Sequence, residues 1–68
     1  MSEPIKWDEE GRAEVDGVDV ECVELGSGRF HVLTSARVAP FIQINDAPDR
    51  DLAARAVVAA VRVLRGER

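Results

Sequence analysis

The sequence predicts an α+β fold, in which three or four strands form an antiparallel β-meander and one C-terminal α-helix packs on one face of the sheet. Two glycine turns in the first half of the chain separate short runs of alternating apolar and polar residues, the pattern of half-buried strands. An Ala- and Val-rich run without internal Gly or Pro follows, as in a helix. A length of 68 residues accommodates one small domain, residues 1–68, and excludes a two-domain enzyme or a solenoid.

The first hairpin is predicted at Asp16-Gly17, because a type I′ turn needs positive φ at both central residues and the Asp-Gly pair tolerates it. A two-residue loop at this point places apolar pairs on one face of the sheet and charged pairs on the other. The expected pairs are Val15 with Val18, Glu14 with Asp19, Ala13 with Val20, and Arg12 with Glu21.

The second hairpin is predicted at 26–28, where the chain reads Gly-Ser-Gly. A last strand is expected over 41–45, after Pro40, and residues 5–7 either add to the sheet or pack over it. The expected cross-strand pairs of the second hairpin are Leu25 with Arg29, Val23 with His31, and Cys22 with Val32. The expected core face of the sheet consists of Ala13, Val15, Val18, Val20, Cys22, Phe30, Val32, Ile42 and Ile44.

The helix is predicted over about 47–65. Asp46 is the expected N-cap, with Asp49 in the capping-box position and Pro48 in the first turn, where its missing N–H costs nothing. Gly66 follows at the position where glycine commonly ends a helix.

The faces of this helix are assigned from its charged residues, on the expectation that the charged face points away from the sheet. More of the circumference is apolar than one contact with a sheet needs, so the flank of the charged stripe is a candidate dimer or second interface. The charged stripe holds Asp51, Arg55, Arg62 and Arg65. The residues expected to pack on the sheet are Ala53, Ala56, Val57, Ala60, Val63 and Leu64. The expected second interface consists of Arg55, Val58, Val61 and Arg62.

The sheet face opposite the helix is the expected partner-binding surface, because apolar residues on neighbouring strands are mixed there with charged ones. Phe41 is the expected anchor, and the hairpin over 14–24 presents five carboxylates near it. A basic groove that binds nucleic acid is a suitable target, because carboxylates can stand where phosphates would sit. The expected partner-binding residues are Glu14, Asp16, Asp19, Glu21, Val23, Glu24, His31, Leu33 and Phe41.

Catalytic chemistry is not expected from this chain. Cys22 and His31 fall on opposite faces of the predicted sheet, so they form no nucleophile–base pair. One His and one Cys cannot make a structural zinc site. The Gly-Ser-Gly turn runs into a strand, whereas a phosphate-binding loop must run into a helix N-terminus. We therefore expect a protein that is not an enzyme and that has no cofactor and no bound metal.

The net charge of −4 is unevenly distributed. Residues 1–24 carry nine acidic and two basic residues, whereas residues 25–68 carry four acidic residues and seven arginines. The acidic half repels phosphate and suits a larger protein or complex with a basic surface. The expected function is that of a small acidic interaction protein, an inhibitor or regulator that occupies a surface of a larger macromolecule. Small inhibitors that phages direct against host defence complexes are similar in length, acidity and build, although no motif is shared.

Two other functions remain open. The chain could be a self-assembling homodimeric structural subunit, because so small a domain has a marginal core and leaves apolar surface to cover. It could instead bind nucleic acid directly through the arginines of the helix, although the overall acidity counts against this. The lone Cys22, the absence of a signal-peptide pattern and the lack of a membrane-spanning apolar run predict a cytoplasmic protein with no membrane partner.

Overall fold

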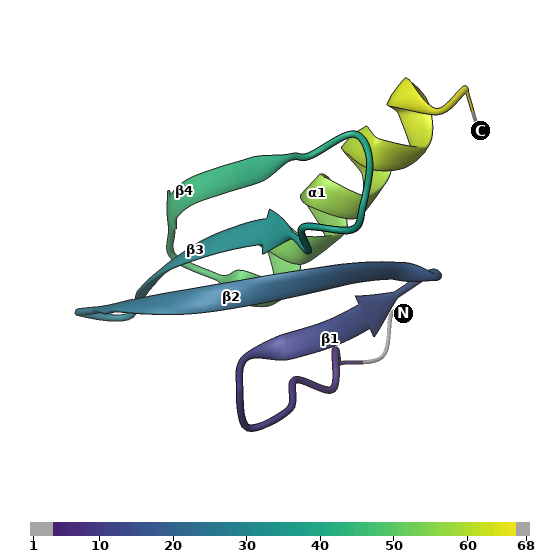
Figure 1. The fold of residues 1–68 in the computed structure, drawn as a ribbon. Helices are drawn as coiled ribbons and strands as arrows, with labels where there is room; N and C mark the ends of the chain where they lie inside the picture. The colour runs from purple at the N-terminus through teal and green to yellow at the C-terminus, as the bar shows by residue number, and fades with distance from the viewer. Residues whose placement is uncertain (1–3, 67–68) are drawn as a thin grey trace.

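Residues 4–66 are described by a computed structural model, in which four antiparallel strands form one sheet and a single helix covers one face of it (Figure 1). The strands lie in the sheet in chain order, as in a meander. The predicted α+β class is confirmed. The elements are β1 (Arg12–Val15), β2 (Val18–Gly26), β3 (Arg29–Thr34), β4 (Gln43–Ala47) and α1 (Arg50–Leu64).

The β1–β2 hairpin has the predicted register along its whole length. Its turn residues, Asp16 and Gly17, have φ of 50° and 81°, so both adopt the left-handed conformation that a type I′ turn requires. Val15 and Val18, which flank the turn, are both buried. The Asp-Gly pair therefore determines which residues of the two strands face the core.

The β2–β3 hairpin keeps the predicted faces but has a different turn. The predicted pairing of Leu25 with Arg29 is wrong, because Gly26 lies opposite Arg29. The turn contains only Ser27 and Gly28, whose φ of 56° and 73° again fit type I′. Leu25 is left as the extra residue of a β-bulge. Beyond the bulge the predicted pairs are confirmed, namely Val23 with His31 and Cys22 with Val32.

β4 begins at Gln43, later than the predicted start at Phe41. The reason lies in Thr34, the last residue of β3, which is fully buried. The N–H of Thr34 donates to the Ile42 carbonyl over 2.9 Å, and the Thr34 hydroxyl accepts from the Ile42 N–H over 3.0 Å. The second bond takes the place of a backbone ladder bond, so regular pairing starts only after Ile42. The side chains of Ile42 and Ile44 pack against the core, as predicted.

α1 begins at Arg50, later than the predicted start. Its N-cap is Asp49, whose carboxylate accepts hydrogen bonds from two N–H groups of the first turn. The predicted cap at Asp46 is wrong, because Asp46 adopts a left-handed conformation (φ 58°) within β4 and Pro48 therefore precedes the helix. At the other end, Gly66 follows the helix with φ of 82°, as predicted.

The face of α1 that packs on the sheet is rotated from the predicted one. Val58 and Val61, which were predicted to line a second interface, are buried in the core, so that prediction is wrong for both. Of the residues predicted to pack on the sheet, Ala53 and Val57 do so, Ala60 is half-buried, and Ala56, Val63 and Leu64 are exposed. The observed buried face consists of Ala53, Ala54, Val57, Val58 and Val61.

The charged residues of α1 explain this rotation, because they lie beside the buried face and reach back to the rest of the chain. Arg62 Nη1 is 3.8 Å from Asp16 Oδ2 in the first hairpin turn. Arg65 Nε donates to the Ala39 carbonyl over 2.8 Å. Long side chains of this kind cover apolar surface with their stems while their charged ends stay in water. The face directly opposite the arginines is therefore not the buried one.

Residues 5–7 pack over the two layers and do not add a strand. Ile5 and Trp7 both contact the core. The carboxylate of Asp51 in the first turn of α1 accepts from the Trp7 indole over 2.7 Å and from the Ile5 N–H over 3.3 Å. The guanidinium of Arg50 lies over the rings of Trp7 and Phe30, at 5.2 and 5.8 Å from their centroids. The start of α1 thereby holds the N-terminal segment in place.

Candidate interaction surface

The face of the sheet that points away from α1 carries apolar side chains on three neighbouring strands or their extensions. Leu33 on β3 lies opposite Glu21 on β2 and opposite Gln43 on β4. Val23 lies two residues from Glu21 and is a diagonal neighbour of Leu33. Phe41 lies two residues before Gln43, just ahead of β4, where continued alternation puts it on the same face. Val23 is 51% exposed and Phe41 55%, whereas Leu33 is half-buried between them. We call Val23, Leu33 and Phe41 the apolar diagonal.

Acidic residues lie on the same outer face, on the side of β1 and β2. Glu14 on β1 is directly opposite Asp19 on β2, and both are exposed. Two like charges at directly opposed positions repel each other. Glu21 lies farther along β2 and is the cross-strand neighbour of Leu33. The acidic group therefore adjoins the apolar diagonal.

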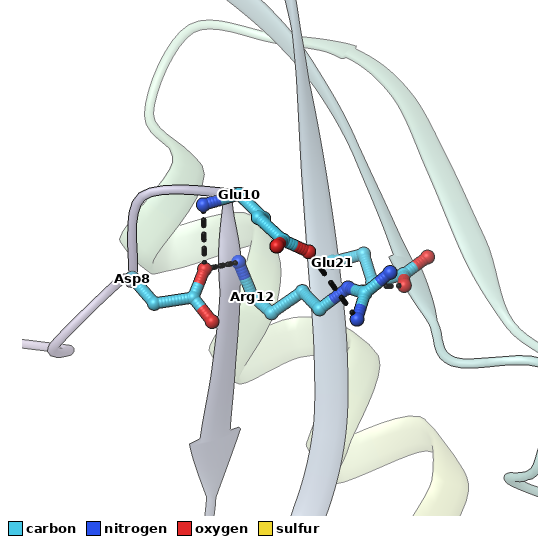
Figure 2. A network of polar contacts seen from close by, with 4 residues as sticks. All are labelled: Asp8, Glu10, Arg12 and Glu21. Carbon is cyan, nitrogen blue, oxygen red and sulfur yellow. Dashed lines mark hydrogen bonds and ion pairs between the residues drawn. The ribbon is translucent and has the colours of Figure 1, made fainter.

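Arg12 places one positive charge among these carboxylates (Figure 2). Its Nε is 3.1 Å from Glu21 Oε1, and its Nη1 is 3.5 Å from Glu10 Oε2. Asp8 holds this loop, because its Oδ1 accepts from the backbone N–H groups of Glu10 and Arg12 over 2.8 and 2.9 Å. Arg12 therefore partly neutralises one end of the acidic group.

A hollow of about 610 Å³ lies over β1, β2 and the segment that follows β3. That segment is held to the sheet by Ser35, whose N–H donates to the Asp19 carbonyl over 3.0 Å. Carboxylates outnumber guanidinium groups in the lining, so a basic side chain of a partner would be favoured there. The charged residues that line the hollow are Asp8, Glu14, Asp19, Glu21, Arg12 and Arg37.

His31 belongs to a polar cluster on the other side of the apolar diagonal. Its Nδ1 accepts from the Asp46 N–H over 3.1 Å, which places the proton of the neutral ring on Nε2. Arg29 donates through Nε to Asp46 Oδ1 over 2.9 Å and through Nη2 to the Asp46 carbonyl over 2.6 Å. The hydrogen bond from Arg29 and its positive charge lower the pKa of the Asp46 carboxyl below its usual value. This cluster fixes His31 beside its cross-strand neighbour Val23.

Most of the residues predicted to bind a partner lie together on this face, and two do not. Asp16 is in the hairpin turn near Arg62, and Glu24 lies opposite Phe30, whose side chain packs against the core. Arg37 was not predicted as part of the surface, because the irregular segment after β3 has no periodicity that would place it. The predicted residues that the outer face brings together are Glu14, Asp19, Glu21, Val23, His31, Leu33 and Phe41.

The residues considered for catalysis and for metal binding are placed as follows. Cys22 and His31 point to opposite faces of the sheet, so they do not act together. Among residues 4–66, no group of three or more His, Cys, Asp or Glu side chains is placed to hold a metal ion. No helix in the described part of the chain is long and apolar enough to cross a membrane. Comparison with protein families, curated proteins and solved structures found no match to this chain.

Proposed function

We propose that this protein is a small acidic interaction protein that binds a basic surface of a larger macromolecule through the outer face of its sheet. By occupying that surface it inhibits or regulates the partner. The observation that carries the proposal is the apolar diagonal with a group of carboxylates directly beside it. An apolar centre with a charged rim is how protein–protein interfaces are commonly built.

In the proposed complex the apolar diagonal forms the centre of the interface, from which water is excluded. Val23 and Phe41 are more than half exposed, and Leu33 lies on β3, between β2, which carries Val23, and the segment ahead of β4, which carries Phe41. Contiguous apolar patches of this kind mark interaction sites on soluble proteins. Phe41 has the largest of the three side chains, and aromatic residues are frequent anchors of interfaces. We therefore assign Phe41 the role of anchor.

The carboxylates select the partner. Glu14 and Asp19 lie side by side at the β1–β2 end of the outer face, and most of the charged residues that line the hollow next to them are acidic. Such a surface attracts a basic partner over long distances and speeds its association. If the basic surface normally binds nucleic acid, the carboxylates stand in place of phosphates and the two ligands compete.

Direct binding of nucleic acid by the arginines of α1 has less support. Arg62 lies 3.8 Å from Asp16, and Arg65 donates to the Ala39 carbonyl. Both are therefore directed toward groups of the same chain, and the acidic outer face would repel a phosphate backbone. This remains the weaker proposal.

The test starts by capturing a partner on the immobilised chain and then compares two double variants in binding kinetics. Glu14→Lys with Asp19→Lys changes charges on the outer face. Asp16→Lys with Glu24→Lys makes the same change in net charge at two positions that do not belong to that face, and is the matched control.

We expect the Glu14 and Asp19 double variant to slow association by about tenfold at low salt, because steering depends on local charge at the contact. The control pair should slow association much less, and added salt should reduce the difference between them. Equal effects of the two pairs would show that association depends only on net charge. That result would contradict binding of the partner by the outer face.

A further inference from the structure

The outward face of α1 is apolar along its whole length. A helix that lies on the surface of a small protein normally turns a polar face to water. On α1, however, Leu52 is 66% exposed, Val63 69% and Leu64 64%. No charged side chain interrupts this face, which consists of Leu52, Ala56, Ala59, Ala60, Val63 and Leu64.

These residues form a ridge that can pair with a copy of itself. Leu52, Ala56, Ala60 and Leu64 are spaced four residues apart, and residues at this spacing form one continuous ridge on a helix. Packing of two such ridges is the commonest arrangement of helix pairs in globular proteins. Small alanines at the centre allow the two helices to approach closely, while a leucine at each end supplies contact area. In a pair related by a two-fold axis, a contact from residue i to residue j is repeated from j to i, so an antiparallel arrangement can set leucine against leucine at both ends and alanine against alanine at the centre.

The charges at the two ends of α1 decide the direction of the pairing. At the N-terminal end Asp49 and Asp51 outweigh Arg50 and leave a net negative charge, whereas Arg62 and Arg65 make the C-terminal end positive. In an antiparallel pair the acidic end of each helix meets the basic end of the other, and the helix dipoles are also opposed. A parallel pair would place like charges together at both ends.

We propose that the outward face of α1 is covered by a second copy of this chain. The two α1 helices pack antiparallel around a two-fold axis between Ala56 and Ala60, and Leu52 of one copy contacts the partner's Leu64. This interface differs from the one predicted around Val58 and Val61, which are in the core. It also leaves the outer face of each sheet uncovered, so the proposal does not depend on the proposed function.

The mass of the protein as a function of concentration tests this proposal, by sedimentation equilibrium. Each copy contributes a single helix, so the buried area is at the small end of the range for protein–protein interfaces. We therefore expect a dissociation constant on the order of tens of micromolar. The mass should rise from the 7.4 kDa monomer toward the dimer as the concentration passes through this range. A mass that remains that of the monomer at roughly ten times this concentration would overturn the proposal.

Two charge variants test the geometry. Leu52→Glu and Leu64→Lys each place a charge against a leucine of the other copy, and each alone should weaken dimerisation at least tenfold. When the two variants are mixed, the introduced carboxylate of one chain should meet the introduced ammonium group of the other, and dimers should form again. In a parallel pair the mixture would gain no such contact. Because Leu52 and Leu64 are both exposed, neither substitution should change the circular dichroism spectrum.

Leu25→Glu is the matched control, because Leu25 is also an exposed apolar residue and lies in the β-bulge, away from α1. It should leave the dimer as strong as in the wild type. Loss of the dimer in this control, or its survival in Leu52→Glu, would place the interface elsewhere and overturn the proposal. The proposal would also be overturned if the wild type stayed monomeric and a foreign protein bound in a way that depends on Leu52.

Discussion

The indole N–H of Trp7 donates a 2.7 Å hydrogen bond to the carboxylate of Asp51, joining the start of the chain to the first turn of α1. The same carboxylate also accepts from the Ile5 N–H. Asp51 thus favours the helix in two ways, because an acidic residue in the first turn also complements the helix dipole. One side chain therefore connects the N-terminal segment, the helix and the core.

The first prediction concerns this carboxylate. Asp51→Ala removes the acceptor for Trp7 and Ile5 and should lower the free energy of unfolding by about 2 kcal/mol, because hydrogen bonds to charged groups are stronger than neutral ones. Urea unfolding followed by circular dichroism measures this. Asp19→Ala, at an exposed position on β2, is the control and should change stability by less than about 0.5 kcal/mol. Equal stability of the two variants would show that the Trp7–Asp51 contact contributes nothing.

The second prediction tests which face of α1 is buried. Val58→Ala leaves a cavity in the core and should cost about 2 kcal/mol of unfolding free energy. Val63→Ala removes the same atoms from the exposed face and should cost less than about 0.5 kcal/mol in the monomer at low concentration. Thermal unfolding of both variants gives the comparison. If Val63→Ala is the more damaging change, the helix packs by the opposite face.

The third prediction concerns Gly11, which has φ of 78° and lies against β2. A Cβ at this position would be 2.7 Å from the Cys22 carbonyl oxygen. Gly26 has a similar φ of 82° but open space around it, so Gly26→Ala isolates the conformational cost of about 1–2 kcal/mol. Gly11→Ala should cost clearly more in denaturant unfolding, because the backbone must also move. A cost no greater than that of Gly26→Ala would contradict the close approach.

The fourth prediction concerns pH. The hydrogen bond and charge of Arg29 lower the pKa of Asp46, so its carboxyl resonance should titrate below the usual value of about 3.9. Because the pKa is lower in the folded state, the interaction stabilises the protein above the unfolded-state pKa, and this contribution is lost as the pH falls through the folded-state pKa. In Arg29→Gln the NMR titration of Asp46 should return toward the usual value. An unchanged titration would exclude Arg29 as the cause.

Local signals in the sequence predicted the sheet well. Asp16-Gly17 favours the type I′ turn that the chain adopts, and a two-residue turn at this point sets the register of β1 against β2. Period-two alternation then placed Cys22 and His31 on opposite faces and Val23 with Leu33 on the outer one. The same alternation predicted most of the candidate surface.

Contacts between distant segments were not predictable in this way. α1 is apolar around most of its circumference, so its pattern does not define a buried face, and the partners of Arg62 and Arg65 come from a turn and a loop. The position of residues 5–7 depends on Asp51, which lies 44 positions away from Trp7. Asp46 and Asp49 both precede the helix, but Asp46 lies within β4 in a left-handed conformation and its carboxylate is bound by Arg29, so Asp49 is the cap.

The affinity of Phe41→Ala for the captured partner tests the proposed function most directly. Isothermal titration should show binding weakened by more than about 1 kcal/mol, while circular dichroism and the unfolding midpoint stay those of the wild type. Leu52→Ala, which truncates an exposed apolar residue of α1 on the other side of the sheet, should bind like the wild type. Unchanged affinity of Phe41→Ala would contradict the assignment of the outer face as the binding surface, and so would unfolding of that variant.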